Sequence, residues 1–281
     1  MRRFLSVAKP GIIFGNMVSC LGGFFLGTAH SMHFGLLFNT LIAMSLVIGS
    51  GCVLNNYIDR DIDLLMERTR NRVLVKGLMS TKIALLYAVV LGILGFALFY
   101  FETNPLTFWM AFIGWFVYVV VYSLAFKRRS NYGTLIGAIA GAIPLVVGYC
   151  AVTNRFDLGA ILLFLILFIW QMPHFYAIAI YRLEDFKAAA IPVLPLQRGF
   201  AYTKKSILVY TVLFTIVAVM PTVFHYAGVI YGVVALALGI MWFVMGLQGF
   251  HTTDDRIWAR KMFLFSILNI TVLCIAMAFK A

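Results

Sequence analysis

Long apolar runs separated by short polar segments extend along almost the whole chain. Each run is near the roughly 20 residues that an α-helix needs to cross a bilayer. The pattern predicts an all-α integral membrane protein, a single polytopic domain over residues 1–281. The first run should be a retained span, because MRRFLSVAKPGIIF shows no cleavage signal after a short apolar core. Nine transmembrane helices are expected near residues 11–30, 36–58, 83–101, 106–125, 133–152, 158–181, 206–224, 227–249 and 262–279.

Composition excludes a soluble domain and charge predicts the orientation. The 281 residues are 63% hydrophobic and 11% charged, with a net charge of +12. With a cytoplasmic N-terminus, every Lys and Arg except Arg155 and Lys280 falls on the inner side, as the positive-inside rule requires. Nucleic acid is not an expected partner, because no basic domain stands outside the membrane. Short loops and no transit peptide favour a bacterial inner membrane.

The acidic residues gather on the same side as the basic ones. Acids have little influence on insertion topology, so their position needs another cause, and a shared metal and phosphate site would supply it. Only Glu102 and Asp157 fall on the outer side; the inner acids are Asp59, Asp61, Asp63, Glu67, Glu184, Asp185, Asp254 and Asp255.

The most informative segment is NNYIDRDID, where an apolar run ends. Asn55, Asp59 and Asp63 recur every four residues and therefore share one helix face, whereas Asp61 points away. Carboxylates at a membrane boundary are costly unless they hold a cation. Mg²⁺ is the predicted cation, held by one or two carboxylates and completed by a substrate phosphate.

Two other interpretations compete with a magnesium site. The acids could simply pair with nearby Arg60, Arg68 or Arg70. A calcium-binding loop is excluded, because counting from Asp59 puts Leu64 where a glycine is needed and Arg70 where a bidentate Glu belongs.

Basic residues follow the acidic segment and end the fourth span. They could be charges that only set topology, or they could bind a diphosphate, Arg bidentately and Lys as a point charge. The residues concerned are Arg68, Arg70, Arg72, Lys76, Lys127 and Arg128.

A second inner loop occupies a similar place four spans later. Tyr181, Arg182 and Asp185 lie at its start, and Tyr181 and Asp185 are four residues apart, which predicts a shared helix face. The recurrence weakly indicates a pseudo-repeat of helix pairs.

His174 follows Pro173 in WQMPHF, within the inner third of the sixth span. Proline in a span frees backbone carbonyls. His174 could therefore bond to that freed backbone, or bind a polar, cofactor-like substrate.

The cysteines offer no redox or metal chemistry by their spacing. They form no CxxC pair and all fall within spans, so we expect buried thiols that act as small apolar residues. They are Cys20, Cys52, Cys150 and Cys274.

These motifs together resemble the protohaem IX farnesyltransferase branch of the intramembrane prenyltransferase (UbiA) superfamily. NNYIDRDID is similar to its NDxxDxxxD motif, and NRVLVKG, YSLAFKRRSNYGTLIG, WQMPHF and IPVLP are similar to segments of the haem branch. The resemblance covers essentially the whole chain. Two departures are Asn56, where the superfamily usually has Asp, and Tyr181, where the second motif usually has an acid.

The resemblance implies nine helices around a central cavity that opens laterally to lipid. It implies Mg²⁺ ligands at Asn55, Asp59, Asp63 and Asp185. It further implies diphosphate contacts from Arg72, Lys76, Lys127 and Arg128, and His174 on the haem side of the pocket.

The implied reaction transfers a farnesyl group from farnesyl diphosphate to a vinyl group of protohaem IX, with water addition, to give haem O. Implied partners are the lipid bilayer and haem-handling or terminal-oxidase assembly proteins. Two alternatives remain: a related enzyme with a quinone-ring or chlorin acceptor, and a transporter that uses intramembrane acids.

Overall fold

The computed structural model describes residues 2–28, 32–128, 130 and 132–279, and this part of the chain is helical without strands. Nine of its helical segments are long and apolar enough to cross a membrane, as the sequence predicted. The elements are α1 (Arg2–Val7), α2 (Pro10–Gly27), α3 (Phe34–Ile58), α4 (Arg60–Leu65), α5 (Thr81–Glu102), α6 (Pro105–Phe116), the π-helix η1 (Val117–Phe126), α7 (Gly133–Thr153), α8 (Leu158–Tyr181), α9 (Leu183–Ala188), α10 (Leu194–Val223), α11 (Val229–Gln248) and α12 (Asp255–Ala276).

Two helices begin well before the predicted spans. α10 starts at Leu194 and α12 at Asp255, whereas the apolar runs begin near residues 206 and 262. Apolar content marks only the part of a helix that lies in hydrocarbon, so polar extensions such as these were missed. Gly199, with φ 77°, interrupts the α10 extension, and Asp254 caps α12 by accepting from two backbone N–H groups.

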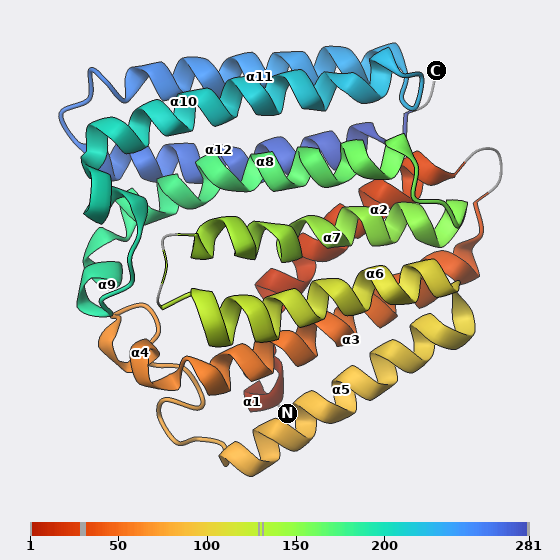
Figure 1. Cartoon of the computed structure of the whole chain (residues 1–281), viewed down its shortest axis with the longest axis horizontal. Coiled ribbons are helices and arrows are strands. Elements are labelled where there is room, and N and C mark those ends of the chain that lie inside the picture. Colours follow the sequence, from red (N-terminus) through yellow and green to blue (C-terminus); the bar gives the residue numbers. More distant parts are fainter. Residues whose placement is uncertain (1, 29–31, 129, 131, 280–281) are drawn as a thin grey trace.

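The long helices run roughly parallel and stack in layers (Figure 1). α10 and α11 form one edge of the molecule, α5 forms the other, and α2, α3, α6, α7, α8 and α12 lie between them. The main helix contacts join α3 with α5, α2 with α7, and α8 with α10. The short helices α4 and α9 both lie at one end of this bundle, which we call the polar end.

Glycines let α2 and α7 approach closely. A Cβ atom at Gly23 would lie 1.9 Å from the carbonyl oxygen of Leu145, and one at Gly148 would lie 1.9 Å from that of Cys20. Small residues at such crossings are typical of membrane helices, where packing replaces the hydrophobic drive to associate. The four cysteines are buried and unpaired, as predicted.

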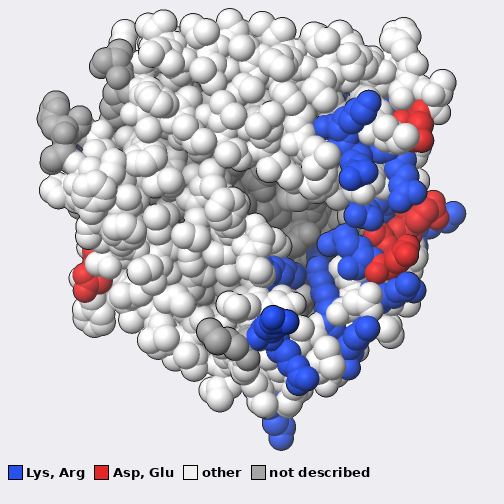
Figure 2. Space-filling model, turned by 180° about the vertical axis from the view of Figure 1, so that it is seen from behind, with Lys and Arg blue, Asp and Glu red and all other residues white. Residues whose placement is uncertain are grey.

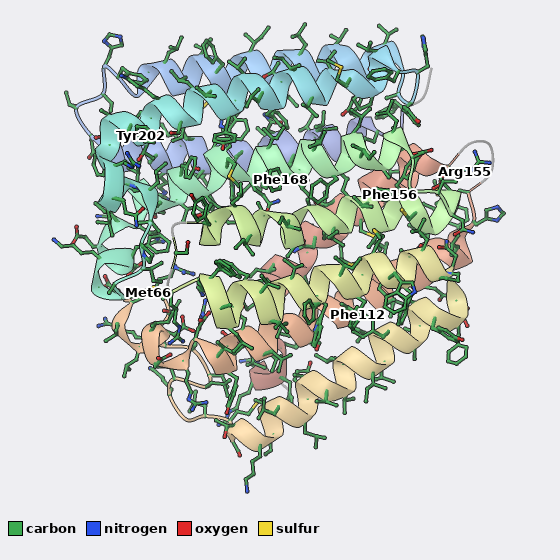
Figure 3. The ribbon with its side chains drawn as sticks, viewed as in Figure 1. Met66, Phe112, Arg155, Phe156, Phe168 and Tyr202 are labelled. Atoms are coloured by element: carbon green, nitrogen blue, oxygen red, sulfur yellow. The ribbon has the colours of Figure 1, made fainter. Side chains whose placement is uncertain are left out.

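Charge is concentrated at the polar end. Figure 2 shows Lys and Arg with several acids at that side of the molecule, beside a hollow in the centre of the face. Figure 3 places Met66 at the polar end and Arg155 at the opposite end.

The two polar-end loops, residues 59–80 between α3 and α5 and residues 182–193 between α8 and α10, pack against each other. Ile62 and Met66 of the first contact a buried apolar cluster that includes Ile191 and Val193 of the second. The carboxylate of Asp185 also accepts a hydrogen bond from the backbone N–H of Glu67 over 2.9 Å. The fold therefore joins the two acidic segments that the sequence separates by four spans.

Candidate active site

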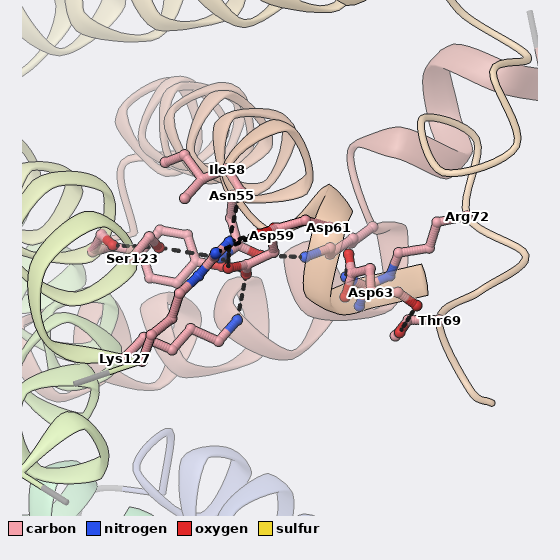
Figure 4. Close-up of polar contacts among 12 residues, drawn as sticks. Asn55, Ile58, Asp59, Asp61, Asp63, Thr69, Arg72, Ser123 and Lys127 are labelled. Carbon is pink, nitrogen blue, oxygen red and sulfur yellow. Dashed lines mark hydrogen bonds and ion pairs between the residues drawn. The ribbon is translucent and has the colours of Figure 1, made fainter. Parts of the chain in front are cut away.

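Asp59 links α3 to α4 without ending the helical path. Its N–H donates to the Asn55 carbonyl at 2.9 Å, and the Asp63 N–H donates to the Asp59 carbonyl at 2.8 Å. The side chains of Asn55, Asp59 and Asp63 are consequently all buried, whereas the Asp61 side chain is 63% exposed. The predicted shared face is confirmed, and Figure 4 shows the cluster.

The Asp59 carboxylate has one well-bonded oxygen and one that lacks a hydrogen bond. Oδ2 accepts from Asn55 Nδ2 at 2.7 Å and forms an ion pair with Lys127. Oδ1 is buried, no described residue gives it a hydrogen bond, and the Arg128 guanidinium lies 3.6 Å away. A buried, incompletely bonded carboxylate oxygen is costly and is suited to receive a cation.

Asp63 is held by a residue of the loop that follows α4. Its Oδ2 forms an ion pair with Arg72, and its backbone carbonyl accepts from the Thr69 hydroxyl at 2.9 Å. The interpretation that these acids pair with Arg60, Arg68 or Arg70 is wrong: Arg60 instead lies over the Tyr57 ring at 4.5 Å.

Lys9 was missed as a site residue. It precedes Pro10 in a left-handed conformation (φ 57°), and its Nζ donates to Asn55 Oδ1 at 2.7 Å. Burial lowers the pKa of Lys9 to about 8, with Arg72 and Lys127 adding to the effect. The only signal in the sequence was a lysine directly before the first span, which looks like any topology-setting charge.

Ser123 was also missed and lies in the π-helix that continues α6. Its hydroxyl accepts from Asn55 Nδ2 at 3.1 Å and donates to the Tyr118 carbonyl at 2.8 Å. π-Helical turns often occur at functional sites. This one sets the register that places Ser123 and Lys127 on the same side, toward the end of α3.

Arg128 connects the buried cluster with the surface. It pairs bidentately with Asp61 at 2.7 Å and donates to the Ile58 carbonyl at 2.6 Å. The Arg128 hydrogen bonds lower the pKa of Asp61 below its usual range. Arg128 therefore has a firm anchor while its guanidinium borders Asp59.

Tyr181 and Asp185, at the start of the second loop, do not share one helix face, contrary to the prediction from the sequence. α8 ends at Tyr181 and α9 begins at Leu183, so Tyr181 and Asp185 lie on separate helices rather than on one continuous face. Tyr181 has two guanidinium groups near its ring, Arg182 at 4.4 Å and Arg256 at 5.9 Å from the centroid.

The Arg68 guanidinium interacts with charged groups of both loops. Partial desolvation lowers the pKa of Arg68, and the positive charge of Arg72 lowers it further. The carboxylates of Asp185 and Asp63 act in the opposite direction. Lys76 is exposed, and no ion pair joins its side chain to the described residues of the cluster.

The donor set suits a metal that arrives with a phosphate ligand. Within the described ranges, no three His, Cys, Asp or Glu side chains converge to hold a metal by themselves. Mg²⁺ usually keeps several waters and binds through one or two carboxylates plus substrate phosphates. Asp59 Oδ1 and the neighbouring Asp63 fit that arrangement, and the surrounding Lys9, Arg72, Lys127 and Arg128 provide a surplus of positive charge.

Comparison with known proteins identifies the family. The profile of the UbiA prenyltransferase family matches residues 16–268. The chain belongs to the UbiA prenyltransferase family. Proteins named protoheme IX farnesyltransferase are similar along the whole chain: that of Sodalis glossinidius (strain morsitans) is 54% identical over 279 residues, 99% of this chain and 94% of the relative. That of Pseudomonas savastanoi pv. phaseolicola is 52% identical over 278 residues, with the same coverage.

Solved structures share the fold. A structure of digeranylgeranylglyceryl phosphate synthase superposes with a TM-score of 0.80 at 18% identity, covering 99% of this chain and 98% of that one. A UbiA homologue from Archaeoglobus fulgidus, bound to GPP and Mg²⁺, gives a TM-score of 0.74 at 16% identity, covering 98% and 99%.

In this UbiA-family protein, His174 lies apart from the acidic cluster, on α8. Its Nδ1 is 2.6 Å from the hydroxyl of Ser266 on α12, so it bonds to a side chain rather than to a carbonyl freed by Pro173. Trp170, one turn earlier, donates to the Ser266 carbonyl at 3.0 Å. These bonds join α8 to α12 and fix the His174 ring.

Proposed function

We propose that this protein transfers a farnesyl group from farnesyl diphosphate to a vinyl group of protohaem IX, with water addition, to give haem O. The observation that carries the proposal is the buried Asp59–Asp63 pair, which is bordered by four cations and has a buried oxygen, Asp59 Oδ1, to which no described residue donates. The choice of haem and farnesyl rests on the 52–54% identity to proteins named protoheme IX farnesyltransferase.

The ion pairs of the cluster indicate which residues would hold a metal and which would contact a diphosphate. Lys127 forms an ion pair with Asp59, and Arg72 forms one with Asp63. Asp59 and Asp63, with Asn55 beside them and Asp185 from the second loop, would hold Mg²⁺, which would supply Lewis-acid stabilisation of the departing diphosphate. Because Lys127 and Arg72 already border this carboxylate pair, both would be within reach of phosphate oxygens bound beside it.

Other basic residues complete the proposed diphosphate site. Arg128 stays anchored by Asp61 and borders Asp59. Lys9 reaches the same place from the start of α2. The two polar-end loops carry three further basic residues, Arg68, Lys76 and Arg182. These side chains would approach the phosphate from the loops rather than from the membrane helices.

The chemistry needs charge stabilisation rather than a protein nucleophile. The C–O electron pair leaves with the diphosphate, where the positive groups stabilise the growing charge. The vinyl π electrons form the new C–C bond to the allylic carbon. Water then bonds to the resulting cationic carbon and releases a proton. Aromatic faces such as Tyr118 and Tyr122, stacked near the cluster, can stabilise the allylic cation.

The proposed orientation places the polar end in the cytoplasm, with the N-terminus on that side and the chain acting as one domain. The concentration of Lys and Arg at that end supports this (Figure 2). The bacterial origin of the relatives supports an inner-membrane location.

The acceptor is the part of the proposal that needs direct testing. Purified protein in lipid nanodiscs is supplied with labelled farnesyl diphosphate and Mg²⁺, together with protohaem IX or a prenyl-free quinone precursor. Label in the haem fraction supports the proposal. Label only in the quinone precursor supports the related acceptor class, and no transfer to either overturns the proposal of an enzyme.

A further inference from the structure

The hydrogen bonds around Ser266 determine which ring nitrogen of His174 carries the proton. The Ser266 Oγ is 2.6 Å from the Phe263 carbonyl, which can only accept. A hydroxyl has a single proton to donate, so Ser266 gives it to that carbonyl. Ser266 therefore accepts from His174, and His174 carries its proton on Nδ1. Its Nε2 is left with a free lone pair.

That lone pair has no partner in the described part of the chain. No hydrogen bond joins His174 Nε2 to another described residue, and Nε2 is absent from the fully enclosed, unpartnered polar atoms. His174 keeps part of its surface accessible. A neutral imidazole with a free, accessible Nε2 is a potential metal ligand.

Aromatic side chains hold the imidazole plane. The Trp170 ring stacks on His174 with centroids 4.6 Å apart and planes at 24°, and the Phe263 ring lies 5.1 Å away. Together with the bond to Ser266, these contacts fix the direction of the Nε2 lone pair. This is the arrangement by which metal-ligating histidines are normally oriented: the other ring N–H donates to a fixed acceptor.

We propose that His174 Nε2 ligates the iron of the haem substrate and that Ser266 positions it by fixing the tautomer. The inference rests on the proposed function, because that function supplies the haem. His174 is seven residues before Tyr181, the last residue of α8, and so lies about 10 Å along the helix from its polar end. Iron at that depth leaves the vinyl edge of the macrocycle free to approach the diphosphate cluster.

The depth also argues against a general base at Nε2. A base for the added water must lie beside the reacting vinyl carbon, next to the departing diphosphate at the polar end. His174 is two turns deeper, among Trp170 and Phe263 rather than among charged groups. The centre of a flat, apolar macrocycle fits these neighbours better than a reaction centre does.

Haem titration of the full-length protein in nanodiscs tests the ligation. Absorption and resonance Raman spectra are recorded for wild type, His174→Gly and Ser266→Ala, with metal-free protoporphyrin IX as the matched ligand without iron. We expect wild type to bind haem more tightly than protoporphyrin. His174→Gly should lose this preference, with haem binding weakened by about 10-fold or more, and added imidazole should restore the wild-type spectrum.

Ser266→Ala separates positioning from simple packing. It should retain haem binding but lower the iron–imidazole stretching frequency of the ferrous protein, because the Nδ1–H donor loses its acceptor. An unchanged haem spectrum in His174→Gly, with wild type still farnesylating haem, overturns the ligation and leaves the proposed function intact. A wild-type protein that farnesylates no haem overturns both. If His174→Gly does not fold, an unshifted iron–imidazole frequency in Ser266→Ala still overturns the proposal.

Discussion

Lys9 Nζ donates a 2.7 Å hydrogen bond to the side-chain oxygen of Asn55, although 46 positions separate the two residues. The contact ties the start of α2 to the end of α3 and brings a cation to the acidic cluster. Asn55 at the same time donates to Asp59 and Ser123. One amide therefore organises three chain segments around the proposed diphosphate site.

Replacing Lys9 by Met should weaken farnesyl diphosphate binding. A hydrogen bond to a charged group contributes about 1.5–3 kcal/mol, so KM for farnesyl diphosphate should rise by about 10-fold or more. Lys9→Arg should restore much of the loss. Steady-state kinetics measure the KM for farnesyl diphosphate in each variant. Lys82→Met is the control, because it also removes one positive charge near the polar end but from an exposed position. An equal rise in KM for the Lys82 variant would mean that only overall charge matters.

Replacing Asp185 by Ala should loosen the contact between the two polar-end loops. The Glu67 N–H would lose its acceptor, and the proposed metal would lose a ligand. We expect faster limited proteolysis within residues 66–80 and an activity loss of about 10–100-fold. Glu184→Ala, an exposed carboxylate one position earlier, is the control. Equal effects of the two substitutions would contradict a specific role for Asp185.

Gly148→Ala should destabilise the fold without touching the site. Its Cβ would lie 1.9 Å from the Cys20 carbonyl, so α2 and α7 must separate, at a cost of about 1–3 kcal/mol. Thermal unfolding in detergent measures the loss. Gly15→Ala on α2, where a Cβ meets nothing within 4 Å, should leave Tm nearly unchanged. A Tm for Gly148→Ala equal to that of wild type would show that this helix pair can relax.

The sequence predicted the spans and the acidic face well because both follow from local periodicity. Apolar length gave the nine helices, and the four-residue spacing of Asn55, Asp59 and Asp63 survives the change from α3 to α4. The sequence could not predict the roles of Lys9 and Ser123, because these depend on tertiary contacts. Nothing local distinguishes Lys9 from a topology-setting lysine, or Ser123 from any serine in a span.

The contacts of the second acidic loop also could not be predicted from local sequence patterns. The helix break at Arg182 separates Tyr181 from Asp185, and the partner of Asp185 is a backbone N–H of the other loop. Likewise, Ser266 on α12 meets His174 across 92 positions, and no spacing rule would pair them.

Farnesyl transfer by Asp59→Ala tests the central claim most directly. In nanodiscs with labelled farnesyl diphosphate, protohaem IX and increasing Mg²⁺, wild type should make labelled haem O. Asp59→Ala should lose on the order of 100-fold or more of that rate, because the charge on the departing diphosphate is no longer stabilised. Glu184→Ala, whose carboxylate is exposed on the second loop, should fall within a few-fold of wild type. A folded Asp59→Ala protein with near-normal, Mg²⁺-dependent transfer would contradict the account.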